Sequence, residues 1–234
     1  MRLLIIRHAD PDYPNNTITP HGRREAEALS VRLAAFGLDR IFSSPLGRAI
    51  DTAKYTADAL GLEIEIEPWT HEITDVRVPD GPDKGYVIWD LAGERLRDDP
   101  AFARSGPWWT KPPLDQPRIK SEVERIGRES DAFLARLGYE RENGVYRVAR
   151  ANTETVAVFC HGGFGLTWLA HLLELPLTLV WSGMFLWPSS VTTVLFEQRS
   201  NEFAVPRCLG IADTSHLFAA GLSPTPSGLK ANVE

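Results

Sequence analysis

The sequence predicts an α/β fold with a parallel sheet, and three observations support that prediction. Over residues 1–67, short apolar runs alternate with segments of helical periodicity in the order β-α-β-α-β, which is typical of parallel strands joined by crossover helices. Residues 155–160 form a buried-strand run that continues directly into an apolar helix. The 234 residues are 43% hydrophobic and 24% charged, which excludes a globally disordered chain.

The first elements carry clear local signals. Residues 3–6 are a continuous apolar run, as in a strand buried on both faces. The following helix is expected to begin after Thr19, an N-cap residue followed by Pro20, and to end at Gly37. A strand, a helix ending at Gly61 and an edge strand with one glutamate-rich face are then predicted at 39–44, 46–60 and 62–66.

The second half is less regular. Residues 68–117 are rich in Pro, Gly, Asp and Trp, which predicts an inserted cap or lid within one domain spanning 1–234. A helix is expected from Ser121, where Glu124 completes a capping box, to Gly138. The remaining predicted segments are a strand at 155–160, a helix at 164–175, a strand at 191–196 and a flexible tail at 223–234.

Charged and imidazole side chains follow the predicted strands at the points where these end. Arg7 and His8 follow the first strand, Arg48 and Glu72 follow the next two, and His161 follows residues 155–160. Ligand sites of open α/β sheets lie at the carboxyl ends of strands, so we expect these side chains to share one crevice.

This set of side chains suits phosphoryl transfer. Arginine binds phosphate oxygens in bidentate fashion, an imidazole can attack phosphorus, and a carboxylic acid can protonate the leaving oxygen. The arginines and the second imidazole supply the positive charge, so the sequence predicts a phosphohistidine route without a metal or other cofactor.

The same residues lie in motifs that resemble those of the histidine phosphatase superfamily, which includes the cofactor-dependent phosphoglycerate mutases. In chain order, the similar segments are Arg7-His8-Ala9, Thr19-x-x-Gly22-x-x-x-Ala26, Ser43-Ser44-Pro45-Leu46-Gly47-Arg48, Glu72 and His161-Gly162-Gly163. The resemblance implies a three-layer α/β/α fold with a mostly parallel central sheet and an inserted region over the site. Two positions depart from the family pattern: Ala9 replaces the usual glycine, and Cys160 stands where serine or threonine is more usual.

The resemblance also implies roles for individual residues. His8 would be the nucleophile, Arg7, Arg48 and His161 would hold the phosphate, and Glu72 would be the proton donor. Asn15, with Asn16 as the alternative, and Gly162 would add substrate contacts. Four other residues could replace Glu72 as proton donor: His71, Asp75, Asp10 and Asp12.

Several other residues have ordinary structural explanations. The turn around Pro11 explains Asp10 and Asp12 better than a metal site does. His171 lies in an apolar helix, as a satisfied core or interface histidine would. Cys160 ends a buried strand, which favours an inert thiol. The tryptophans of residues 68–117 fit either a core or a lid.

The predicted function is hydrolysis of a small phosphorylated metabolite through phosphorylated His8. The expected ligand is that metabolite or inorganic phosphate. A mutase and a binding module that has lost catalysis are the alternatives. A net charge of −6 without a basic tract argues against nucleic acid, and no apolar run is long enough for a membrane span. Two cysteines and no signal-peptide pattern predict a cytoplasmic protein. The apolar stretch 172–187 fits core burial and a homodimer interface equally well.

Overall fold

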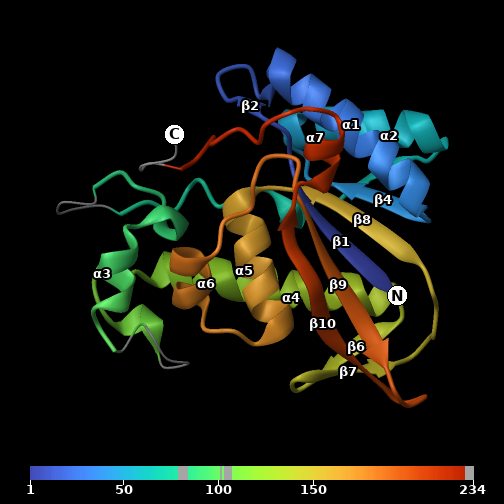
Figure 1. The fold of residues 1–234 in the computed structure, drawn as a ribbon. Helices are drawn as coiled ribbons and strands as arrows, with labels where there is room; N and C mark the ends of the chain where they lie inside the picture. The colour runs from blue at the N-terminus through green and yellow to red at the C-terminus, as the bar shows by residue number, and fades with distance from the viewer. Residues whose placement is uncertain (79–83, 101, 103–106, 230–234) are drawn as a thin grey trace.

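The computed structural model describes residues 1–78, 84–100, 102 and 107–229. An eight-stranded sheet in the order β5-β4-β8-β1-β9-β10-β7-β6 forms its centre, and β2 and β3 form a separate hairpin (Figure 1). The strands are β1 (Arg2–Arg7), β2 (Pro11–Asp12), β3 (Thr17–Ile18), β4 (Arg40–Ser43), β5 (Ile64–Ile66), β6 (Tyr139–Glu142), β7 (Val145–Val148), β8 (Thr155–Cys160), β9 (Val191–Gln198) and β10 (Phe203–Asp213).

Helices cover both faces of this sheet, so the predicted three-layer α/β/α architecture is confirmed (Figure 1). Alternate residues of β1 face opposite ways: Leu4 and Ile6 belong to the core under α1 and α2, whereas Leu3 and Ile5 belong to the core under α4 and α5. The helices are α1 (Pro20–Phe36), α2 (Gly47–Leu60), α3 (Gly93–Arg97), α4 (Pro117–Arg136), α5 (Gly162–Leu173), α6 (Leu177–Gly183) and α7 (Ser215–Ala219), with 3-10 turns η1 (Pro68–Thr70), η2 (Ile88–Asp90) and η3 (Trp108–Thr110).

The sheet is parallel in one half and antiparallel in the other. Strands β5, β4, β8 and β1 run parallel to one another, and the β-α-β-α-β pattern of residues 1–67 predicts this for β1, β4 and β5. From β9 to β6 every pairing is antiparallel, because these strands are added as the hairpins β9–β10 and β6–β7. The sheet is therefore parallel over the half that carries the predicted site residues, rather than mostly parallel throughout.

The helix predicted from Ser121 begins earlier. Its first residue is Pro117 and its N-cap is Gln116, so Ser121 and Glu124 lie inside α4 and form no capping box. Proline suits the first turn of a helix because that turn has no partner for its N–H group. Of the described helices, none has the length and apolar character that crossing a membrane requires.

Candidate functional site

His8 and His161 lie side by side at the carboxyl end of the parallel half of the sheet. Parallel pairing sets Arg7 opposite Cys160, so the residues that follow β1 and β8 are neighbours. The two imidazole ring centroids are 5.2 Å apart, and the residues are 2% and 0% exposed. The fold therefore brings together two histidines that lie 153 positions apart in the sequence.

The His8 ring is held in one tautomer. Its Nδ1 lies 2.7 Å from the carbonyl oxygen of Ala9, which can only accept a hydrogen bond, so Nδ1 carries the proton. The other ring nitrogen, Nε2, keeps its lone pair. Ala9 is itself fixed, since its backbone N–H donates to Thr52 Oγ1 on α2 at 3.0 Å.

Ser44 orients the ring of His161. His161 Nε2 lies 2.7 Å from Ser44 Oγ, and the Leu46 backbone N–H donates to the same oxygen at 3.3 Å. A hydroxyl that already accepts this bond can donate its own proton to Nε2, which places the ring proton on Nδ1. That Nδ1 is buried and has no hydrogen-bond partner among the described residues.

Two arginines flank the histidines. Arg7 is held by backbone carbonyls: its Nη1 donates to Leu186 at 2.5 Å and its Nη2 to Ser227 at 2.9 Å. Arg48 lies in the first turn of α2 and its Nη1 donates to Asn16 Oδ1 at 3.2 Å. Each guanidinium also lies over an aromatic ring, Arg7 over Phe185 and Arg48 over Tyr13.

A close backbone contact joins α2 to the loop between β2 and β3. An added Cβ on Gly47 would overlap the carbonyl oxygen of Asn16, so glycine is required beside Arg48. This contact holds the 13–16 loop against the helix that carries Arg48.

Glu72 is anchored at the beginning of α5. The backbone N–H groups of Phe164 and Ile73 donate to its Oε1 at 2.7 and 3.0 Å, and that of Gly163 donates to its Oε2 at 3.1 Å. A helix N-terminus favours a carboxylate, because its first N–H groups have no partner within the helix. Glu72 is 6% exposed. Burial lowers the pKa of the Arg48 guanidinium, and the negative charge of Glu72 opposes this lowering.

Burial and positive charge control the ionisation of the two imidazoles. Burial lowers the pKa of His8 well below its usual value, and the positive charges of Arg7 and Arg48 lower it further. Burial likewise lowers the pKa of His161, with His8 and Arg48 adding to the effect. Both rings are therefore neutral at neutral pH. Burial raises the pKa of the Cys160 thiol, in keeping with the inert thiol expected from sequence.

The predicted substrate contact at Asn15 lies elsewhere. Asn15 is exposed and its side chain donates to Asp12 at 2.8 Å, whereas the neighbouring Asn16 contacts Arg48. Gly162 does lie at the site, because an added Cβ there would be 3.6 Å from Arg7 Nε. Among the alternatives to Glu72, Asp75 is exposed, and Asp10 is engaged by the hydroxyls of Thr19 and Ser227.

The structure adds a segment that the sequence did not connect with the site. The carbonyl of Ser227 accepts from Arg7, its hydroxyl bonds to Asp10, and Thr225 Oγ1 donates to the buried Glu25 at 3.2 Å. Sequence reasoning treated 223–234 as a tail because its composition is polar and proline-rich. That flexibility stays a prediction, while residues 225–227 as described lie against the site.

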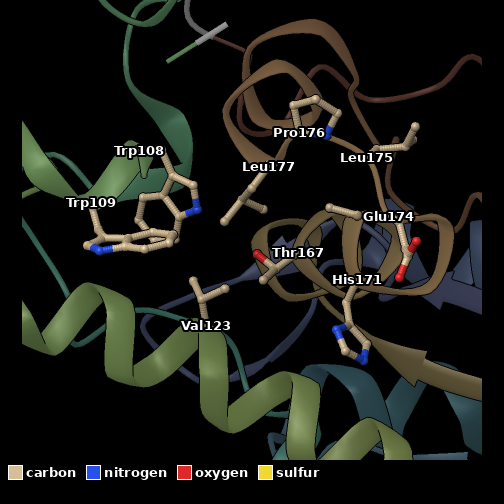
Figure 2. A pocket seen from close by; sticks show the side chains of 10 residues that line it. Trp108, Trp109, Val123, Thr167, His171, Glu174, Leu175, Pro176 and Leu177 are labelled. Carbon is tan, nitrogen blue, oxygen red and sulfur yellow. The ribbon is translucent and has the colours of Figure 1, made fainter. Parts of the chain in front are cut away.

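A separate cavity of about 270 Å³ lies between α4, α5 and the tryptophans of η3 (Figure 2). His171 is one of the lining residues, and its Nε2 lies 2.9 Å from Asp131 Oδ1, so it is the satisfied histidine that its apolar helix predicts. Trp108 and Trp109 line the opposite wall. Within the described ranges, no group of three or more His, Cys, Asp or Glu side chains is arranged to hold a metal ion.

Comparison with known proteins finds one family model and several relatives that match parts of this chain. Residues 3–76 match the model of the histidine phosphatase superfamily, branch 1. A putative phosphoserine phosphatase of Hydrogenobacter thermophilus is 25% identical over 183 residues, 73% of this chain and 84% of the relative. A probable phosphoglycerate mutase of Yersinia enterocolitica is 28% identical over 82 residues, and the chain covers only 38% of that relative's length.

The fold is similar to solved structures over nearly its whole length. A mutant phosphoserine phosphatase from Entamoeba histolytica, in complex with phosphoserine, superposes with a TM-score of 0.62 at 21% identity. The match covers 92% of this chain and 98% of that one. The residues that match the histidine phosphatase model include Arg7, His8 and Arg48, which the fold brings together with His161.

Proposed function

We propose that this protein hydrolyses phosphate monoesters through a phosphorylated His8. One observation carries the proposal: three buried nitrogens, Arg7 Nε, Arg48 Nε and His161 Nδ1, have no hydrogen-bond partner among the described residues. Buried polar groups are rarely left unpaired in native proteins, and a phosphoryl group would supply the missing oxygen acceptors. His8, whose Nε2 carries a lone pair, lies next to these three side chains.

In the first step, His8 Nε2 attacks phosphorus. The new N–P bond forms as the ester P–O bond breaks, and the leaving oxygen takes a proton from Glu72. The neutral state of His8 is essential here, because a protonated Nε2 has no lone pair with which to attack. The hydrogen bond from Nδ1 to Ala9 fixes the tautomer that exposes Nε2.

In the second step, water attacks the phosphohistidine. Glu72, now a carboxylate, takes a proton from the water as the P–N bond breaks, which releases phosphate and restores His8. Arg7, Arg48 and the Nδ1–H of His161 would bind the phosphoryl oxygens in both steps. These groups neutralise the charge that develops, so the proposed steps use no metal ion.

The proposed substrate class is a small phosphorylated metabolite. Support comes from the relatives, since the similar proteins include phosphoserine phosphatases. Residues 68–117 form the proposed cap, and Trp89 of this segment packs against the first turn of α5. A mutase would use the same first step and then pass the phosphoryl group to a second hydroxyl instead of water.

Hydrolysis of p-nitrophenyl phosphate with and without EDTA tests the proposal. The wild type should release phosphate in both conditions, and His8→Ala should lower kcat by a factor of at least about 1,000. His171→Ala is the matched control, because this imidazole lies outside the site and should leave kcat within about twofold. Activity lost to EDTA, or retained in His8→Ala, would contradict the proposal. Transfer to an added alcohol without net phosphate release would indicate the mutase.

A further inference from the structure

Trp89 lies against the first turn of α5. A Cβ added to Gly163 would overlap the ring atoms Cδ1, Nε1 and Cδ2 of Trp89. The indole therefore fills the space that any side chain at position 163 would need, and glycine is required there by this contact. Trp89 comes from η2, in the segment between β5 and α4, and its partly buried ring packs against the core.

The same indole is bonded to a second segment of backbone. Trp89 Nε1 donates a hydrogen bond to the carbonyl oxygen of Ile73 at 3.2 Å. A buried indole N–H requires such a partner, and Ile73 is the residue that directly follows Glu72. One side chain thus joins the 72–73 segment to the beginning of α5.

Both contacted segments hold the Glu72 carboxylate. Ile73 donates to Oε1 from one side, while Phe164 and Gly163 donate to Oε1 and Oε2 from the other. We propose that Trp89 is a positioning residue for Glu72: it fixes the distance between the two backbone segments whose N–H groups orient the carboxylate. This inference rests on the proposed function, in which Glu72 protonates the leaving oxygen.

Proton donation depends on placement, and its importance depends on the leaving group. An alkoxide is a strong base, so the P–O bond of an alkyl phosphate breaks only as the oxygen receives a proton. The p-nitrophenolate ion is a weak base and leaves without one. A displaced Glu72 should therefore lower kcat/KM selectively for alkyl phosphates, because kcat/KM covers the steps up to release of the leaving group and not the later attack of water, which all esters share. General damage to the site would lower kcat/KM for all esters alike.

The experiment compares kcat/KM for glycerol phosphate and p-nitrophenyl phosphate in Trp89→Phe, which keeps an aromatic ring and removes the N–H donor. We expect kcat/KM for the alkyl ester to fall about tenfold or more, while kcat/KM for the aryl ester stays within about twofold. Glu72→Gln should show the same selectivity to a greater degree. Trp108→Phe is the matched control, because that ring lines the separate cavity (Figure 2) and should leave the ratio unchanged.

A second pair of variants tests the contact with Gly163. Gly163→Ala should displace the indole and reproduce the selective loss, whereas the same substitution in a Trp89→Ala background should cost little more, since no ring remains to be displaced. Amide exchange at Gly163 and Phe164 should be faster in Trp89→Phe than in Trp108→Phe, a readout that needs no activity.

The outcomes separate the two proposals. An equal fall in kcat/KM for both esters, or an unchanged ratio of the two kcat/KM values in Trp89→Phe, would overturn the role of Trp89. Hydrolysis through His8 would be left in place. A wild type that hydrolyses neither ester would overturn the proposed function and the role of Trp89 with it.

Discussion

Burial and two neighbouring arginines keep His8 uncharged, and the proposed attack of its Nε2 on phosphorus requires this uncharged ring. Both effects disfavour the imidazolium, so His8 should stay neutral well below pH 6.5, the pKa of an unperturbed histidine. Protonation of His8 Nε2, which would prevent the proposed attack on phosphorus, should occur only in more acidic solution. His161 responds to the same surroundings, which keeps its Nδ1–H a neutral hydrogen-bond donor.

This gives a prediction for the ligand-free protein. In a nitrogen-15 NMR titration, His8 and His161 should both take up their protons below the pH at which an unperturbed histidine does, and Arg48→Gln should raise the pKa of His8 because one nearby positive charge is removed. Arg40→Gln is the control, since Arg40 pairs with Glu65 on the exposed edge of the sheet. A His8 that is already charged at pH 6 in the wild type would show that burial and the arginines do not govern its ionisation.

Single residues show how far sequence reasoning reaches. Arg7, His8, Arg48 and His161 could be expected at one edge of the sheet, because Arg7 ends β1, His8 and His161 directly follow β1 and β8, and Arg48 lies in the helix after β4. Asn15 and Asn16 could not be separated in this way. The choice depends on a left-handed backbone at Asn16, with φ of 50°, which a sequence of adjacent asparagines does not disclose.

At the scale of elements, the segment 225–227 closes one side of the site with few contacts. The hydroxyls of Thr225 and Ser227 bond to Glu25 and Asp10, and these bonds place the Ser227 carbonyl on Arg7. Arg7 thereby keeps two carbonyl partners, while its Nε has no hydrogen-bond partner among the described residues.

Removing both hydroxyls should release this segment. In Thr225→Val/Ser227→Ala, we expect KM for p-nitrophenyl phosphate to rise about fivefold, the equivalent of roughly 1 kcal/mol, with kcat within about twofold, because Arg7 loses a partner that holds it. Ser223→Ala, an exposed position of the same segment, serves as the control. A fall in KM would show instead that the Ser227 carbonyl competes with substrate for Arg7.

Sequence patterns did not reveal β6, β7, β10 or the true start of α4, and each case has a physical reason. The hairpin of β6 and β7 has short strands with several charged residues, and its turn places Asn143 in the left-handed region, with φ of 56°. Strand β10 alternates exposed and partly buried residues and contains Pro206, which weakens its strand signal. The start of α4 was missed because Ser121 and Glu124 match a capping box that Pro117 makes unnecessary.

For the molecule as a whole, the parallel half was predictable, whereas in the antiparallel half only β9 was expected from the sequence. Apolar runs with crossover helices determine the order of β1, β4, β5 and β8, and the site follows from the ends of these strands. Hairpin strands at the other end of the sheet carry no comparable constraint on their neighbours. The site could therefore be located from the sequence although half of the sheet could not.

The stability of the whole chain should fall in acid because it buries neutral histidines. His216 on α7 is 4% exposed, lies 3.1 Å from Ser189 Oγ through its Nε2, and has its pKa lowered by burial and by Arg32 from 6.5 to about 4. Between pH 6.5 and about 4, His216 binds a proton in the unfolded chain but stays neutral in the folded chain. The stability is therefore complete above pH 6.5 and is lost progressively as the pH falls toward 4.

For His216 alone, the loss in the free energy of unfolding is about 3 kcal/mol at most. Urea unfolding between pH 7 and pH 4 should show this decline, steepened by His8 and His161, whose pKa values are lowered in the same direction. His216→Gln should be less stable at neutral pH but should lose less on acidification, because the variant has no imidazole to protonate at this position. An equally steep decline in His216→Gln and in the wild type would show that this histidine does not couple the fold to pH.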